Sequence, residues 1–588
     1  MKIKQKLMIL MCISALFLSA CNSGGAQSVG DNNDVVQTQS TTVLQETDIT
    51  KFTNDQFDGA DLYEDWSKSK TTIITINDLG ISHDGTEDSG IKIEGKHITI
   101  SKAGDFAING VCEDGSITVD CDQPGIVRII MDNCSMTNQS GSALHIEKAE
   151  KVVVTASFET SNLLADGTAT DDKAGAAVYS KENLTFNGSG TMTIYGNRKD
   201  AVVCDKNLKF TSGTYNINGK DNGVVASQGI TLKNGCYNLQ SNGAGFKTTS
   251  TNDAEGYIGI ETGSYSITSG GNALEAKGSI YYLNGSLALT TGAGATLSDG
   301  IVAKGLKAGG NFEMYGGSAQ IQSVDDAVYA NGSVKIATGC LNASAGDDGI
   351  VAGENIEILG GSIVLSQCVE GFESNGVSLT GGFIDINATS DGINVCGGND
   401  GSAKEERVGI NDFERSGEGE VTISQTCINI KSDADAIDVV GSLTVESGAT
   451  YIRGGQAEGN NSIDCSKDYI ITSGNVNAAG VESEVITPSD ASKQNTVVLE
   501  YSDVQNPGTV ACIKNSKDEL IACFSPASGF TKAVISKPEF KDGEKYSWYA
   551  ATIKEDAVTK YGEIVSEDVN LGDKIADFTV EKGVTIVK

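Results

Sequence analysis

Apolar and polar residues alternate in short runs along most of the chain, and the alternation itself repeats. The runs NIEIL at 355–359 and SIVLS at 362–366 follow SVKIA at 333–337 and CLNAS at 340–344 after 22 residues. Alternation with a period of two is typical of β-strands and not of helices. Glycine usually separates the runs, which favours tight turns between them. The pattern therefore predicts many short strands in an all-β chain.

A column of mostly acidic or amide residues recurs with the same period. Each member is usually followed by glycine or alanine and then by an apolar residue. Aligned on Asp326, the column contains Asp200, Asn222, Ala244, Asn272, Asp299, Asp326, Asp348, Glu370, Asp391, Asp435 and Asn461. Turns of about 22 residues with three short strands each predict a parallel β-helix, because a single turn buries its apolar side only against its neighbours. A β-propeller fits less well, since its four-stranded blades need about 40 residues.

The two ends of the chain depart from this repeat. Residues 1–21 combine lysines, an apolar run and the sequence LSAC, which resembles a bacterial lipobox, so we expect a lipoprotein signal peptide with Cys21 as the lipidated residue. An ordinary signal peptide is the alternative. Residues 22–60 are polar and predict a flexible tether, 61–484 the parallel β-helix, and 485–588 a small C-terminal β module or cap. The expected location is the extracytoplasmic face of the cell membrane, at the cell surface.

The net charge and the cysteine spacing argue against a nucleic-acid-binding protein and against a structural zinc site. The net charge of −35 lacks the basic footprint of a nucleic-acid-binding protein. Twelve cysteines lie outside the signal region without a CxxC pair, which argues against structural zinc. Cys236, Cys340 and Cys427 each precede a column residue by eight positions, and we expect them to be buried in strands. Disulfides between neighbouring turns are left open.

The acidic members of the column are candidate calcium ligands. Stacked carboxylates about 5 Å apart repel one another by roughly 3 kcal/mol at an effective dielectric constant of 20, and calcium prefers such oxygen ligands. Asp and Asn also stabilise turns without a metal, and the asparagines of the column favour that explanation. The predicted metal ligands are Asp299, Asp325, Asp326, Asp347, Asp348, Glu370 and Asp391.

Candidate catalytic groups are few. Lys277 and Lys304 each follow a column position by five residues and are expected beside the carboxylates. A lysine near calcium could remove a proton next to a uronate carboxylate, although balancing charge is the commoner role. We therefore predict no catalytic residue, and Lys304 and Lys277 only if the protein is a lyase.

Several longer stretches carry a family resemblance. HITISKAGDFAINGVCEDGSITVD, VRIIMDNCSMTNQSGSALHI, the DDGI turns and SPASGFTKAVISKPEFKDGEKYSWY, together with the lipobox, resemble bacterial surface proteins with a carbohydrate-binding domain. That resemblance implies a right-handed parallel β-helix similar to pectate and other polysaccharide lyases. It also implies polysaccharide binding together with calcium, with the family's acidic turns at Asp325–Asp326, Asp347–Asp348 and Asp391. Glu370 in place of Asp, and the missing acid at Ala244 and Asn272, depart from the pattern.

Three functions follow as alternatives. The first is a cell-surface lipoprotein that binds an acidic polysaccharide such as polygalacturonate, because calcium would neutralise both partners. The second is a calcium-dependent polysaccharide lyase, and the third is a surface protein that calcium only stiffens. A neutral glycan would instead need aromatic stacking, for which Tyr281, Tyr282 and Tyr315 are candidates, since Trp66 and Trp548 lie outside the repeats.

Overall fold

The computed structural model describes most of the chain after residue 55. The described ranges are 56–67, 70–168, 175–252, 255–292, 300–395, 418–453, 462–481, 487–526, 529–554, 559–560, 563–564 and 569–588. The compact unit 57–588 contains every described strand. Within these ranges the secondary structure is β, and none of the described segments is a helix long and apolar enough to cross a membrane.

Each regular turn contributes three strands. One turn consists of β29 (Val328–Ala330), β30 (Val334–Ile336) and β31 (Cys340–Ala345), and the next of β32 (Ile350–Ala352), β33 (Asn355–Ile358) and β34 (Ser362–Cys368). Corresponding strands pair in parallel and in register: Val328 with Ile350, Val334 with Ile356 and Leu341 with Ile363. The 22-residue repeat is therefore one complete turn of a solenoid.

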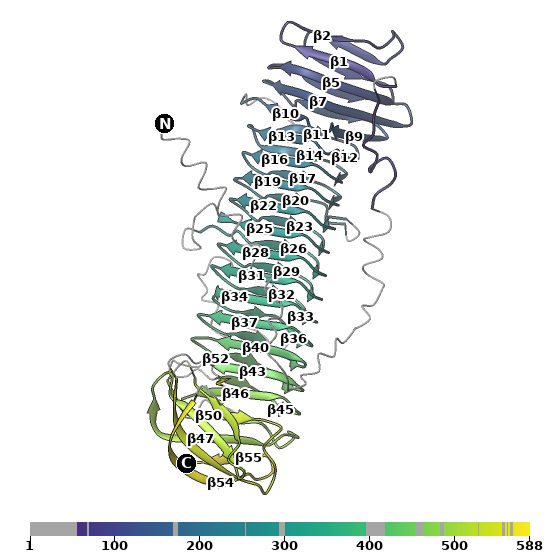
Figure 1. Ribbon diagram of the computed structural model, residues 1–588. Coiled ribbons are helices and arrows are strands. Elements are labelled where there is room, and N and C mark those ends of the chain that lie inside the picture. Colours follow the sequence, from purple (N-terminus) through teal and green to yellow (C-terminus); the bar gives the residue numbers. More distant parts are fainter. Residues whose placement is uncertain are drawn as a thin grey trace, which may run out of the picture. The chain divides into compact units, whose positions relative to one another are not determined.

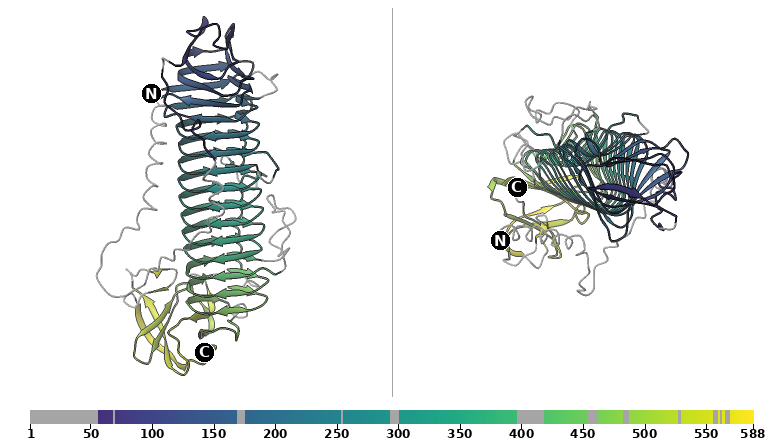
Figure 2. Two further views of the ribbon diagram at one scale, coloured as in Figure 1. Left: turned by 90° about the vertical axis from the view of Figure 1, so that its right-hand side faces the viewer. Right: turned by 90° about the horizontal axis from the view of Figure 1, so that it is seen from above.

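The stacked strands form long parallel ladders (Figure 1, Figure 2). The first strands of the turns belong to a 16-stranded sheet that runs from β3 (Ile91–Glu94) to β44 (Ile463–Cys465). The second and third strands belong to one 33-stranded sheet, because β7 (Ile126–Asn138) pairs with both β9 (Lys151–Ala156) and β10 (Ser161–Asp166). About 14 turns stack in this way, which confirms the predicted parallel β-helix.

Apolar rows from all three ladders meet inside the turns. One row passes through Phe312, Val334 and Ile356, and all three side chains are fully buried. Aromatic rings extend the same stacking, since Tyr237 stacks on Tyr215 at 5.1 Å and on Tyr265 at 4.6 Å between ring centroids. Each turn thus buries its apolar side against the turns above and below, which supplies the main favourable term in folding.

The parallel stacking ends with β46 (Asn475–Gly480). It pairs with β43 (Gly448–Arg453) in parallel but with β50 (Phe530–Ser536) antiparallel. Beyond it, β47 (Thr496–Gln505) and β55 (Val584–Val587) continue this sheet. A separate six-stranded sheet contains β48 (Val510–Asn515), β49 (Leu520–Phe524), β51 (Lys545–Ile553), β52 (Thr559–Lys560), β53 (Glu563–Ile564) and β54 (Val569–Thr579). The strands after β46 thus form a β region of their own, in which β50 covers the edge of the last solenoid strand.

The cysteines correct one expectation. Cys236 is exposed, and Cys340 and Cys427 are half-buried, whereas we expected all three to be buried. They occupy outward-facing positions: in β31, for instance, Cys340 is followed by the buried Leu341, and side chains alternate between faces. The disulfide found among the described residues joins Cys512 to Cys523 across β48 and β49, within the C-terminal module and not between turns.

Candidate functional site

The acidic column occupies the bend before the first strand of each turn. Asp326 precedes β29, Asp348 precedes β32, Glu370 precedes β35 (Phe372–Glu373) and Asp391 precedes β38 (Ile393–Val395). All four side chains are buried, with exposed fractions between 0% and 7%. Charged residues are rarely buried unless they are paired, so these bends need an explanation beyond turn formation.

The column residues are linked by a ladder of hydrogen bonds. Three of these side chains accept a hydrogen bond from the backbone N–H of the column residue one turn later: the N–H of Asp348 donates to Asp326 at 3.3 Å, that of Glu370 to Asp348 at 3.0 Å and that of Asp435 to Asp391 at 2.8 Å. Asn222 donates to Asp200 and accepts from Ala244 in the same way. Asp and Asn therefore share one structural role here, and that role needs no metal.

The residue after each column position is small because the backbones of neighbouring turns approach closely there. A Cβ atom added at Gly371 would lie 2.2 Å from the carbonyl oxygen of Gly392 in the next turn. The Asp–Gly pairs that recur in the sequence thus combine a hydrogen-bonding side chain with a close approach of two backbones.

The strand register corrects one member of the column. Leu274 of β23 (Leu274–Ala276) pairs with Leu306 of β26 (Leu306–Ala308), and Leu306 pairs with Val328. The position between Asn272 and Asp326 therefore belongs to Lys304, whose N–H donates to Asn272 Oδ1 at 2.8 Å. Asp299, the predicted ligand, lies outside the described residues. The misalignment arose because DGIVA at 299–303 copies the DGIVA at 348–352.

A spacing rule would have found Lys304. The column residue lies eight positions before the first buried residue of the second strand. This spacing holds for Asn272 and Ile280, for Asp326 and Val334, and for Asp348 and Ile356. Lys304 keeps this distance to Phe312, whereas Asp299 does not. The bend and the second strand together fix the register, because both must stack on the preceding turn.

Lys304 is a buried cation within the column. Its Nζ lies 2.9 Å from Asp325 Oδ2, contacts Asp326 Oδ2, and is 4.7 Å from the centre of the Tyr329 ring. Burial tends to lower the pKa of Lys304, but the charges of Asp326 and Asp325 outweigh it and the pKa is raised. Lys304 therefore stays protonated and neutralises part of the acidic column.

Lys277 lies elsewhere. It follows β23 on the side opposite to the bend of the column and is exposed. Its backbone N–H donates to Thr248 Oγ1 at 3.0 Å. The two candidate lysines are thus not brought together.

Further along the column, neighbouring carboxyl groups raise one another's pKa. Burial, the charge of Glu370 and the charge of Asp326 raise the pKa of Asp348 well above its usual value. Burial and the charges of Glu370 and Asp435 raise the pKa of Asp391 to about 8. Burial and Asp325 raise the pKa of Asp326 to about 6, although Lys304 opposes the shift. A cation at this edge would relieve the repulsion that causes these shifts.

Three of the carboxylates could hold a metal ion. One oxygen from each of Asp325, Asp326 and Asp347 lies within 4.8 Å of the others. Asp325 Oδ1 is buried and accepts no hydrogen bond from the described residues. A buried carboxylate oxygen without a donor, in an all-oxygen cluster, fits a hard cation such as calcium. The cluster brings together three of the seven predicted ligands, while Asp348, Glu370 and Asp391 continue the same column.

A second acidic feature lies on the outside of the solenoid. An open groove of about 550 Å³ follows the outer face of β33, β36 (Gly376–Leu379) and β39 (Val421–Ile423). Its lining includes Glu354, Glu357, Glu418 and Glu420. An anionic ligand would approach this groove only with cations between the two surfaces.

The fold and the column define a parallel β-helix with a buried carboxylate ladder at one edge. Residues 94–349 match the model of the family described as carbohydrate-binding domain-containing protein, which confirms the resemblance over that range. A carbohydrate-binding domain-containing protein of Acetivibrio thermocellus is 26% identical over 134 residues, 22% of this chain and 47% of the relative. The match thus spans about half of the relative's length. A solved polysaccharide lyase-like protein from C. thermocellum, a gadolinium derivative, is similar with a TM-score of 0.39 and 22% identity, over 42% of this chain and 96% of that chain.

Proposed function

We propose that the protein binds polysaccharide at the cell surface, favouring an acidic glycan such as polygalacturonate, with calcium held by the β-helix. The family match over residues 94–349 supports carbohydrate binding. The carboxylate cluster of Asp325, Asp326 and Asp347 is the observation that supports calcium. Lipid anchoring through Cys21 completes the proposal and rests on the sequence LSAC alone.

Because the cluster is buried, calcium bound there would have a different role from calcium in contact with the glycan. Asp325 and Asp326 are fully buried and Asp347 is 2% exposed, so an ion bound there would join successive bends and stiffen the stack. Contact with an acidic glycan falls instead to exposed carboxylates, of which the groove lined by Glu357 and Glu420 is the best-defined set. Calcium between that groove and a uronate chain would neutralise both.

The burial also favours one alternative, a surface protein that calcium only stiffens. It gives no such support to a lyase. A general base must be deprotonated and within reach of the substrate. Lys304 is 4% exposed, paired with two carboxylates and protonated. Its role in the proposal is to balance charge.

Neutral glycans are a weaker match to the aromatic side chains. Trp548 is buried in the C-terminal module, and Tyr282 is fully buried with its hydroxyl donating to the Gly285 carbonyl at 2.7 Å. Tyr281 and Tyr315 are half-buried, and the Tyr315 hydroxyl contacts Glu313 Oε2. A platform for sugar stacking needs exposed ring faces, so these rings contribute little.

Retention on immobilised glycan tests the proposal. Residues 22–588 are mixed with polygalacturonate or with a neutral glycan, each with calcium or with chelator, and ultraviolet absorbance from unsaturated sugars is followed in the same samples. We expect calcium-dependent retention on polygalacturonate with constant absorbance. Rising absorbance would indicate a lyase, and absence of retention on any glycan would contradict the proposal and leave the stiffened surface protein.

A further inference from the structure

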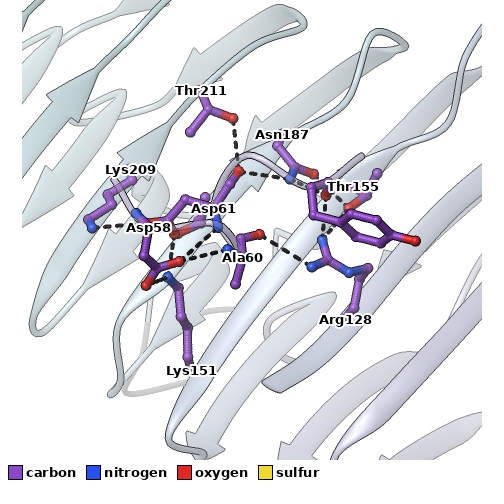
Figure 3. Close-up of polar contacts among 11 residues, drawn as sticks. Asp58, Ala60, Asp61, Arg128, Lys151, Thr155, Asn187, Lys209 and Thr211 are labelled. Atoms are coloured by element: carbon purple, nitrogen blue, oxygen red, sulfur yellow. Dashed lines mark hydrogen bonds and ion pairs between the residues drawn. The ribbon is translucent and has the colours of Figure 1, made fainter. Parts of the chain in front are cut away.

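A short acidic segment before the first strand lies across the outer face of the solenoid. We call residues 57–66 the strap. It crosses β7, β9, β12 (Leu184–Asn187) and β15 (Asn207–Phe210), near the first turns (Figure 3). At its centre Asp61 is fully buried, with its carboxylate 2.6 Å from Lys151 Nζ, 3.1 Å from Lys209 Nζ and 2.6 Å from the Thr185 hydroxyl.

The backbone carbonyls of the strap are bound by side chains of the same face. Arg128 donates to Ala60 O at 3.2 Å and to Tyr63 O at 2.8 Å. Asn187 donates to the carbonyls of Asp61 and Tyr63, each at 2.9 Å. The guanidinium of Arg128 also lies 5.0 Å from the centre of the Tyr63 ring. The face thus recognises an extended chain that presents oxygen acceptors, carboxylates and a flat ring.

No backbone-to-backbone hydrogen bond joins residues 57–66 to a strand among the described residues. The strap is therefore not an added strand of the sheet. The strands below it use their own N–H and C=O groups for stacking, and only their outward side chains hold the strap. Any extended chain with similar oxygen groups could make the same contacts.

The two lysines of this face depend on the strap for their ion-pair partners, whereas Arg128 also lies 3.7 Å from Asp105. In the described part of the chain, the ion pairs of Lys151 are with Asp58 at 2.7 Å and Asp61, and that of Lys209 is with Asp61. Both side chains rise from the outer surface of the sheet, so they would become solvated if the strap left. In a chain of net charge −35, this is a local concentration of positive charge.

The strap carboxylates are firmly ionised. Burial tends to raise the pKa of Asp61, but hydrogen bonds from Lys151 and Thr185 outweigh it and the pKa lies below its usual value. The pKa of Asp58 is lowered against burial by the hydrogen bond from Lys151. The face therefore favours the ionised form of the carboxyl groups that it holds.

We propose that the face formed by Arg128, Lys151, Asn187 and Lys209 is a binding site for a carboxylate-bearing polysaccharide, and that the strap occupies it until such a chain displaces it. The inference rests on the proposed function for the class of ligand, since both involve an acidic glycan. It differs in chemistry, because lysine and arginine bind the carboxylates here and calcium is not needed.

Hydrogen exchange of the full mature chain tests the displacement directly. The exchange of amides 57–66 is measured in chelator, with and without saturating polygalacturonate and with a neutral glycan as control. We expect the acidic glycan to raise the exchange rate in the strap about tenfold and the neutral glycan to leave it unchanged. Unchanged exchange with polygalacturonate would overturn the proposal.

Two full-chain variants separate a binding site from a merely structural contact. Asp61→Asn weakens the strap but keeps the cations, so affinity for polygalacturonate in chelator should rise about tenfold. Lys151→Ala with Lys209→Ala also frees the strap but removes the cations, so binding in chelator should be lost. Lys92→Ala with Lys181→Ala, at exposed pairs with Glu94 and Glu147, is the charge-matched control. Equal affinities for the Asp61 and the double lysine variants would overturn the proposal.

The variant Glu357→Gln with Glu420→Gln distinguishes this inference from the proposed function. It removes the groove carboxylates to which the proposed function assigns calcium-mediated glycan contact, and it leaves the strap face intact. If calcium-dependent retention fails in every protein while Asp61→Asn binds in chelator, the calcium proposal is wrong and the strap site stands. If calcium-dependent retention is observed while Asp61→Asn does not bind in chelator, only the strap site is overturned.

Discussion

Lys304 with Asp325 and Asp326, and Lys151 and Lys209 with Asp61, form two groups of ion pairs in which the pKa values of Asp326 and Asp61 shift in opposite directions. At the inner bends, Lys304 pairs with Asp325 and Asp326, and further along burial and like charges raise the pKa values of Asp348 and Asp391. On the outer face, Lys151 and Lys209 enclose Asp61 and lower its pKa. The ratio of cations to carboxylates differs between the two places, and the lysines of the outer face are also more exposed than Lys304.

The comparison indicates how charge is balanced at each place. The column has acidic groups in excess, so it would gain from an additional cation. The strap face supplies a cation on each side of one carboxylate, so it is complete with the strap and becomes a receptor for anions without it. One strongly acidic chain therefore presents an edge that favours metal ions and a face that favours polyanions.

Removing the cation of the column should have the largest effect. Lys304→Ala leaves Asp325 and Asp326 buried beside each other without a counter-charge, and breaking a buried pair in this way costs about 3–5 kcal/mol. We expect a matching loss in urea unfolding in chelator, with partial recovery on adding calcium. Lys181→Ala should leave the unfolding midpoint nearly unchanged. A Lys304→Ala protein as stable as the parent would show that the column tolerates its full charge.

Acid should release the strap. Because the pKa values of Asp58 and Asp61 are lowered in the folded protein, their contribution is present above the unfolded value of 3.8 and is lost as pH falls through the lower, folded values. The Trp66 indole N–H, at the end of the strap, donates to Ser157 Oγ at 3.2 Å. The fluorescence of Trp66 should therefore report whether the strap is bound. In a Trp548→Phe background, its fluorescence should stay constant from pH 7 to about 4 and change below. The change should be absent in Asp61→Asn, in which the strap is already loose.

Neutralising one member of the column should have the smallest effect. Asp391→Asn keeps a side-chain oxygen that can accept the hydrogen bond from the Asp435 N–H, which is 2.8 Å long in the parent protein. The substitution removes a carboxyl group whose pKa is raised to about 8. In chelator at pH 8.5, we expect a gain of up to about 1 kcal/mol in unfolding free energy, since one repulsive neighbour is gone. In calcium the gain should vanish. A clear loss in chelator would mean that the ionised carboxylate is stabilising without any metal.

The sequence predicts the regular part of this structure well because the same physical requirement recurs in every turn. Apolar positions such as Val334 and Ile356 repeat at the turn length since each must stack on the next. The insertion before Lys304 breaks the period, and DGIVA at 299–303 then imitates a true bend, so the alignment failed there. The eight-residue spacing to Phe312, the buried start of the second strand, identifies Lys304 instead.

The strap could not be predicted in the same way. Its contacts join residues far apart in the chain, such as Asp61 with Lys209, and no local pattern links them. Asp58 and Ala60 fall within 22–60, whose polar composition predicts a tether, yet both contact the solenoid. Composition describes how a segment behaves alone, whereas a matching charged surface elsewhere decides where it binds.

Calcium titration of residues 22–588 by calorimetry tests the central claim most directly. The account predicts saturable binding that Asp325→Asn combined with Asp347→Asn abolishes or weakens at least tenfold, while Asp61→Asn leaves it unchanged. Binding that is equally strong in the column variant, or no binding in the parent protein, would contradict the assignment of the acidic column as a calcium site.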